Sequence, residues 1–171
     1  MISPRHYARA MELMDKEIIY CGGIGDGIRI APTILDRVTW ASPIMQEEIF
    51  APILPVITFD RLDEAIRQIA VREKPLALYL FTNRASAQEK VLSRISFGGG
   101  CINDTIMHLA SSHLPFGGVG MSGMGKYHGK YTFDTFSNQK AVLKKSRFMD
   151  FSFRYPPYSP AKLHKIKKFL K

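Results

Sequence analysis

The stretch LPFGGVGMSGMGKYHG, residues 114–129, combines glycines and a lysine in two spacings that could bind a phosphate. In one register, residues 118–123 spell G-x-G-x-x-G, the pattern that brings backbone close to the pyrophosphate of a dinucleotide. In another register, residues 120–126 spell G-x-x-x-x-G-K, which approaches a Walker A loop. A third interpretation is a glycine-rich connector, and the flanking residues distinguish the three interpretations.

The residues on either side favour the connector. A dinucleotide loop leaves a strand and opens a helix, but the preceding HLASSHLPF contains a proline and is no clean strand. A Walker loop needs a Ser or Thr hydroxyl after its lysine to bind Mg²⁺, and Tyr127 follows Lys126. We therefore expect these glycines to let the backbone pass close to another surface.

A second stretch, PIMQEEIFAPILPV at residues 43–56, places two carboxylates beside an aromatic ring. Glu47 and Glu48 precede Ile49 and Phe50. A carboxylate can accept hydrogen bonds from two ribose hydroxyls, and an aromatic ring can lie against the sugar or base. Taken alone, the stretch is more typical of a solvated acidic turn than of a ribose site.

The third stretch, SFGGGCINDTIMH at residues 96–108, contains one of only two cysteines. Two cysteines, Cys21 and Cys101, suggest neither a disulfide framework nor a zinc site. Cys101 follows three glycines in an apolar segment, so we expect a buried structural thiol, and the same for Cys21. The alternative is a Cys-His hydrolase built from Cys101 and either His108 or His113. The remaining histidines include His6 and His164, which are expected at the surface.

The net charge of +9 is confined to one end of the chain. Residues 140–171 hold ten Lys or Arg and one acid, whereas residues 1–139 hold fourteen of each sign. The chain as a whole is therefore not expected to bind nucleic acid, and the basic end is interpreted as a solvated face or a contact with anionic membrane or nucleic acid. No apolar run is long enough to span a bilayer, and the N-terminal residues do not resemble a signal peptide. Together with the few cysteines, this predicts a cytoplasmic protein with no transmembrane segment.

Periodicity predicts an α/β fold with a mostly parallel sheet flanked by helices. PLALYLFT is expected to be a buried strand, and pairing in APILPVITF is expected mainly after Pro55 because proline cannot donate to a ladder. FRYPPYSP is expected to be extended, and KLHKIKKFLK at most a short helix. Helices are expected to begin at Ser3–Pro4, at Asp60 and at a capping box formed by Ser86 and Glu89. Further strands are expected at KEIIYC and RIAPTILDRV, a short strand or a turn is expected at GGGCIND, and AVLKK is a candidate strand.

The three stretches together resemble the C-terminal part of the aldehyde dehydrogenase superfamily. EEIFAP is similar to the family's EEIFGP box, with Ala51 in place of the glycine. FGGGCIND is similar to the family strand that follows a helix there, and LPFGGVGMSGMGKYHGKYTFDTFS is similar to the PFGG-x-x-x-SG-x-G signature of the class-3 and fatty-aldehyde branch. The resemblance runs from about Ile2 to Lys162.

The resemblance implies NAD- or NADP-dependent oxidation of an aldehyde to a carboxylic acid through a thioester on a cysteine. In the family the nucleophilic cysteine, the general base and the Rossmann cofactor domain all precede the EEIFGP box by long stretches, whereas 47 residues precede Glu48 here. The resemblance therefore implies that this chain contains neither the catalytic nucleophile and base nor the Rossmann domain, and that it is inactive alone. Glu48 would hold the nicotinamide ribose, Phe50 would pack against it, and Phe116 and His128 would line the aldehyde site. No metal site is expected.

The expected organisation has three parts. Residues 1–139 form a partial catalytic domain, residues 140–147 an oligomerisation strand that joins a homodimer, and residues 148–171 an extended basic tail. The alternative is a non-enzymatic dimerisation or interaction module derived from the same fold.

Overall fold

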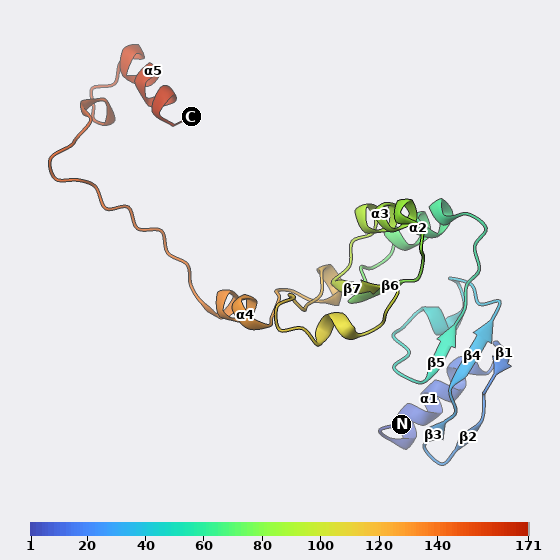
Figure 1. The fold of residues 1–171 in the computed structure, drawn as a ribbon. Helices are drawn as coiled ribbons and strands as arrows, with labels where there is room; N and C mark the ends of the chain where they lie inside the picture. The colour runs from blue at the N-terminus through green and yellow to red at the C-terminus, as the bar shows by residue number, and fades with distance from the viewer. Residues whose placement is uncertain (171) are drawn as a thin grey trace.

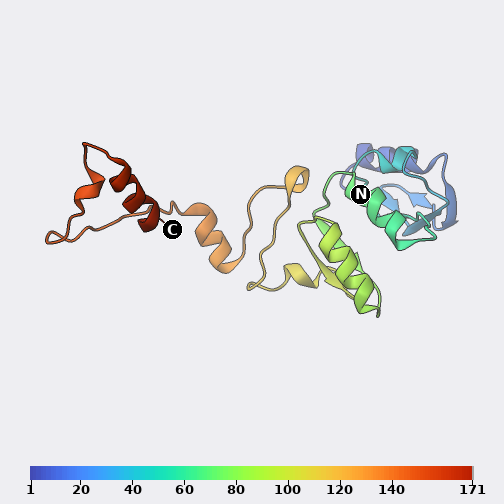
Figure 2. The ribbon, with the colours of Figure 1, turned by 90° about the horizontal axis from the view of Figure 1, so that it is seen from above.

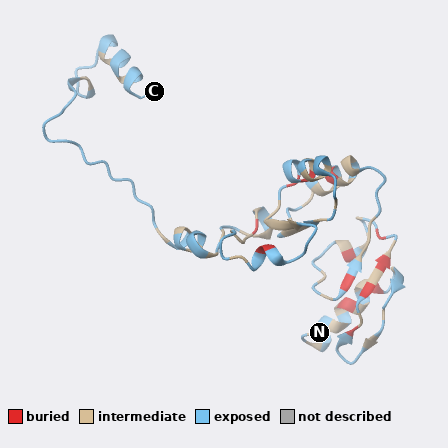
Figure 3. Ribbon diagram, in the orientation of Figure 1, coloured by how far each residue is buried: buried red, intermediate tan, exposed pale blue. Residues whose placement is uncertain are grey.

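The computed structural model of the chain describes residues 1–170. Two small lobes lie next to each other at the N-terminal end, and the chain then continues through a helix and a long unpaired stretch to a separate C-terminal helix (Figures 1 and 2). The buried residues lie in the two lobes, and the C-terminal third is exposed (Figure 3).

In the first lobe, a helix packs against a three-stranded sheet. Helix α1 (Pro4–Met14) starts where predicted, with the Oγ atom of Ser3 accepting a hydrogen bond from the His6 amide at 3.3 Å. The sheet has the order β1 (Ile18–Cys21), β4 (Thr33–Asp36) and β5 (Ile53–Pro55), and a hairpin of β2 (Gly25–Asp26) and β3 (Arg29–Ile30) lies beside it. The core consists of Ala10, Met14, Ile30, Leu35, Val38, Ile44 and Ile53.

Strand β5 pairs earlier than the sequence predicted. Its pairing with β4 joins Ile53 to Thr33 and Leu54 to Ile34, before Pro55, so the expectation of pairing after that proline was wrong. The prolines are tolerated because their carbonyl oxygens still accept hydrogen bonds. The Thr33 amide, for example, donates to the Pro52 oxygen at 2.9 Å. The β4–β5 pair is parallel, whereas β1 and β4 are antiparallel.

The second lobe contains one parallel strand pair and two helices. Strand β6 (Ala77–Leu80) pairs in parallel with β7 (Gly99–Ile102), and α2 (Leu62–Ala70) and α3 (Ala85–Arg94) pack on it through Ile66, Val91 and Ile95. Asp63 joins the two helices by ion pairs to Lys90 at 2.7 Å and Arg94 at 3.1 Å. The hydrogen bond from Lys90 is the main reason that the pKa of the Asp63 carboxyl is lowered.

Three predictions for this lobe need correction. The helix that was expected from a Ser86–Glu89 capping box begins at Ala85 instead, with Arg84 as an N-cap that makes no side-chain cap bond. The strand PLALYLFT is only half-buried in this chain. Across both lobes the prediction of one mostly parallel sheet also fails, because the described strands form three small sheets, of which one is mixed, one antiparallel and one parallel.

The glycines of β7 are required by close packing of the two strands, which yields a stability prediction. A Cβ atom on Gly100 would overlap the backbone oxygen of Leu78, whereas one on Gly99 would meet the movable ring of His108 at 3.0 Å. We expect Gly100→Ala to lower the free energy of unfolding by about 1–3 kcal/mol, with a smaller loss for the matched control Gly99→Ala. Urea unfolding of both variants measures the difference, and equal losses would contradict this explanation.

The C-terminal third contains helix α4 (Gly129–Phe136), a short 3₁₀ turn η4 (Ser152–Arg154) and helix α5 (Pro160–Phe169). The structure assigns no strand to AVLKK, so that strand prediction is not met within this chain. The tail is extended only in part, since KLHKIKKFLK forms most of α5, capped by the Ser159 hydroxyl.

Candidate functional site

The acidic turn at residues 47–50 is held against α1 by one arginine. Arg9 donates from Nη1 to the backbone oxygen of Ile49 at 2.9 Å and from Nη2 to the backbone oxygen of Glu48. Its Nε donates to a carboxylate oxygen of Glu47 at 3.2 Å. A planar guanidinium suits such a multiple contact because its donors are fixed in one fork. Arg9 therefore fixes the course of the turn, a role that the sequence did not indicate.

This arrangement gives the side chains of the two adjacent glutamates different surroundings. Glu47 is engaged by Arg9, whereas the Glu48 side chain is exposed and makes no hydrogen bond among the described residues. Phe50 is 77% exposed and adopts a left-handed backbone with φ of +48°, which turns the chain sharply after the carboxylates. The turn thus presents one free carboxylate and one open aromatic ring.

Glu48 and Phe50 line the same cavity of about 800 Å³, whose other wall is formed by residues before α1 and by the N-terminal part of α1. That wall consists of Met1, Ile2, Arg5, His6 and Arg9. A hollow of this size, beside a carboxylate and an aromatic ring, is large enough for a small-molecule ligand. His6 is exposed, as expected.

A second group of candidate residues forms a row of rings. The ring of Phe116 stacks on His128 with centroids 6.0 Å apart and lies 5.8 Å from His108, and the His108 ring meets Tyr79 of β6 at 5.8 Å. Phe116 is fixed because its backbone exchanges hydrogen bonds of 3.0 and 2.9 Å with Tyr127. The result is a continuous aromatic wall.

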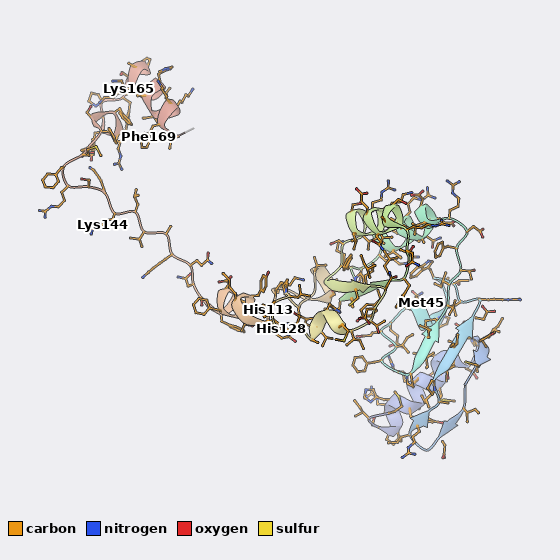
Figure 4. The ribbon with its side chains drawn as sticks, in the orientation of Figure 1. Met45, His113, His128, Lys144, Lys165 and Phe169 are labelled. Carbon is orange, nitrogen blue, oxygen red and sulfur yellow. The ribbon has the colours of Figure 1, made fainter. Side chains whose placement is uncertain are left out.

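His128 is held at the end of this wall by its backbone and its ring. Its φ of +89° is uncommon for a side-chain-bearing residue, and its amide donates to the Thr132 hydroxyl at 2.9 Å. Its Nδ1 atom lies 3.2 Å from the Leu114 oxygen. Figure 4 places His128 at the start of α4, beside His113.

The structure does not bring the two groups of candidates together. Glu48 and Phe50 belong to the first lobe, whereas Phe116 and His128 follow β7 at the far side of the second lobe (Figures 1 and 4). No hydrogen bond, ring contact or shared cavity in residues 1–170 joins the two pairs. The four candidate residues therefore form two separate groups in the described part of the chain.

The glycine-rich loop is a connector, as predicted. Lys126, which a phosphate site would need, donates instead to the backbone oxygens of Gly98, at 2.9 Å, and Gly117. A Cβ atom on Gly118 would overlap backbone at Ser122. In the dinucleotide register Gly118 is followed directly by the 3₁₀ turn η3 (Gly120–Ser122) and not by the α-helix whose N-terminus would receive a phosphate, since α4 begins only at Gly129.

The structure places Cys101 next to His108 and not next to His113. The Cys101 sulfur lies 3.6 Å from Nδ1 of His108, which is buried. Nε2 of His108 has no hydrogen-bond partner among the described residues, so no third group orients the imidazole as a hydrolase would require. Cys101 is only half-buried, and Cys21 is exposed, which corrects the expectation that it is buried.

Residues 1–170 contain no group of three or more His, Cys, Asp or Glu side chains that could hold a metal ion. None of their helices is both long and apolar enough to cross a bilayer.

Comparison with known proteins matches residues 1–142 to the aldehyde dehydrogenase family. Rat aldehyde dehydrogenase family 3 member B1 is 52% identical over 167 residues, which cover 95% of this chain and 36% of that protein.

Solved structures agree. Staphylococcus aureus AldH in a substrate-bound state superposes with a TM-score of 0.88 at 50% identity, over 100% of this chain and 38% of that one. An NAD-dependent aldehyde dehydrogenase from Sinorhizobium meliloti gives a TM-score of 0.75 at 30% identity, over 87% of this chain and 32% of that one. The chain thus spans less than two fifths of the length of these relatives, and by sequence and fold it belongs to the aldehyde dehydrogenase family.

Proposed function

We propose that this chain is the C-terminal part of an NAD- or NADP-dependent aldehyde dehydrogenase that oxidises an aldehyde to a carboxylic acid. The observation that carries the proposal is the Arg9-held turn, which leaves the Glu48 carboxylate and the Phe50 ring free beside one cavity. Glu48 accepts hydrogen bonds from the ribose of the nicotinamide cofactor, and Phe50 packs against that ribose and ring. The bound cofactor supplies the hydride acceptor.

The remaining candidate residues have roles on the substrate side. Phe116 and His128 form one wall of the aldehyde site, and the stack on His108 and Tyr79 keeps that wall rigid. The nucleophilic cysteine, the general base and the Rossmann domain lie outside residues 1–171, so the isolated chain is inactive. Two free cysteines suit a reducing compartment, and we place the protein in the cytoplasm.

A chimera tests this function in a complete enzyme. Residues 1–171 replace the matching segment of S. aureus AldH, to which the chain is 50% identical over its whole length. We expect the chimera to reduce NAD or NADP with an aldehyde that the parent enzyme oxidises. A folded chimera that binds the cofactor but shows no turnover would contradict the proposed function.

The Arg9 clamp gives a prediction within that chimera. Arg9→Lys keeps a positive charge but loses the fork that reaches the Glu48 and Ile49 oxygens. Each lost hydrogen bond should cost about 1 kcal/mol of cofactor binding free energy, because Glu48 is then held less well. The KM for the cofactor should therefore rise roughly fivefold or more. Arg5→Lys is the matched control, because Arg5 lines the same cavity but makes no hydrogen bond to the turn. Equal effects of the two variants would show that Arg9 does not position Glu48.

We further propose that residues 140–147 join two copies of the chain by strand addition. Val142 and Leu143 are 79% and 90% exposed, and the backbone of this segment is unpaired within the chain. An open segment of this kind can pair through its amides and carbonyls with the sheet of a partner.

Val142→Pro removes one amide donor and should abolish the dimer without unfolding the lobes. Sedimentation of the 171-residue chain measures this: we expect dimers, and larger species at higher concentration, for the wild type only. A wild-type chain that remains monomeric at high micromolar concentration would exclude this interface.

A non-enzymatic module of the same fold is the second candidate. The observation in its favour is the large exposed apolar surface, which includes Phe50, Phe81 and Phe133. An active chimera decides against it.

A further inference from the structure

The two lobes are joined by one short segment and by few side-chain contacts. Residues 58–61 connect the first lobe (residues 1–57) to the second lobe (residues 62–102). No hydrogen bond or ion pair of the described residues runs from one lobe to the other. A single connection without such bonds allows two units to turn about a hinge. The relative orientation of the lobes therefore depends on the other contacts at their junction.

Apolar packing at this junction is incomplete. A cavity of about 280 Å³ lies between the lobes. It is lined by Met45 and Ile57 of the first lobe and by Gln68 and Ile69 of α2, and Figure 4 shows Met45 at this place. The side chains around such a gap lose part of their dispersion contacts, so apolar packing alone joins the lobes only loosely.

One directed contact crosses the junction beside the cavity. The Cζ atom of Arg72 lies 3.9 Å from the centroid of the Trp40 ring, within the range of a cation–π interaction. Both side chains are half-buried, so water weakens this contact less than one at the open surface. Arg72 is fixed just after α2, since its amide donates to the Ile69 oxygen at 3.1 Å and its Nη1 donates to the Gln68 oxygen.

Trp40 is tied to the acidic turn of the candidate cofactor site. Its backbone oxygen accepts a hydrogen bond from Nε2 of Gln46 at 2.7 Å, and Gln46 directly precedes Glu47. Arg9 holds the same turn from the side of α1. The cation–π contact thus connects the second lobe to residues 47–50 by a short path.

We propose that Trp40 and Arg72 fix the two lobes relative to each other and are thereby positioning residues for hydride transfer. This role in the reaction rests on the proposed function, in which Glu48 and Phe50 place the nicotinamide ring and Phe116 helps to place the aldehyde. Hydride transfer depends on the distance between the two reacting carbons. A loose junction therefore slows the chemical step without weakening the binding of cofactor or aldehyde.

A distance measurement between two spin labels tests the junction in the 171-residue chain without any activity. One label is placed on Cys21 of β1 and the other on Ser86→Cys of α3, in a Cys101→Ser background that leaves no third thiol. Dilution with unlabelled chain restricts the measurement to distances within one molecule. We expect a narrow distance distribution that Arg72→Met broadens. Arg67→Met, which removes an exposed arginine of α2, is the matched control and should leave the distribution narrow.

The chimera tests the role in the reaction. Arg72→Met and Trp40→Leu should each slow the pre-steady-state burst at least about fivefold, since a displacement of the reacting atoms by about 1 Å can cost roughly 100-fold. The KM values for cofactor and aldehyde should change less than about twofold. Arg72→Lys keeps a cation over the ring and should retain most of the rate. The double variant should be no slower than the slower single variant, because both changes remove the same contact.

The outcomes separate this proposal from the proposed function. A distribution that stays narrow in Arg72→Met would overturn the proposal. An unchanged burst in the Arg72→Met chimera would overturn it too, because the parts of the enzyme outside this chain would then hold the lobes by themselves. Equal slowing by Arg67→Met would have the same consequence. A wild-type chimera without turnover would contradict the proposed function and the role in the reaction, whereas the distance measurement still decides whether Trp40 and Arg72 fix the lobes.

Discussion

Replacing Glu48 by glutamine in the chimera is expected to slow hydride transfer to the cofactor by about tenfold or more. Hydrogen bonds to a charged group contribute roughly 1.5–3 kcal/mol each, and a carboxylate that accepts two ribose hydroxyls makes two of them. Every 1.4 kcal/mol of lost transition-state stabilisation corresponds to about a tenfold slower step. Glutamine keeps the size of the side chain, so the decrease in rate measures the contribution of the negative charge and of the second acceptor oxygen.

The measurement is the pre-steady-state burst of NADH or NADPH formation. Glu47→Gln is the matched control, because Glu47 is a neighbour of the same type whose carboxylate faces Arg9. That ion pair is partly exposed, so its loss should cost less than about 1 kcal/mol and slow the burst by less than about fivefold. An unchanged burst in Glu48→Gln would exclude a role for Glu48 in holding the ribose.

Elements with local signals could be predicted from the sequence. Ser3 and Pro4 mark the start of α1 because cap and first turn lie within a few residues. The 3.6-residue spacing around Ile66 likewise predicted α2. Strand pairing is set by partners distant in the chain, which explains why the register of β5 and the mixed direction of the sheets were missed.

The candidate site was predictable only in part, for the same reason. The resemblance of the motifs singled out Glu48, Phe50, Phe116 and His128, but Arg9 reaches a turn about 40 residues further along the chain and has no local signal. Lys126 shows what the flanking residues could decide: its spacing approaches a Walker loop, the following Tyr127 argued against a phosphate site, and its ammonium group donates to two backbone carbonyls.

The isolated chain is expected to have no aldehyde dehydrogenase activity. A thiolate nucleophile needs a partner that lowers its pKa or a base that is itself oriented. Cys101 has only His108 beside it, with no described group that orients the imidazole, and Cys21 is exposed at the end of β1. Enzymes of this kind exceed the uncatalysed rate by about 10⁶-fold or more, so the contrast between the chain and the chimera should span that range.

The central claim, that this chain supplies the cofactor turn and the substrate wall but not the nucleophile, is tested most directly by assaying both proteins side by side. Purified chain and chimera are mixed with aldehyde and NAD or NADP, and reduced cofactor is followed over time. We expect turnover by the chimera, retained after Cys101→Ser, and no rate above the uncatalysed reaction for the chain alone. Turnover by the isolated chain that disappears in Cys101→Ser would contradict the claim, because it would place the nucleophile at Cys101.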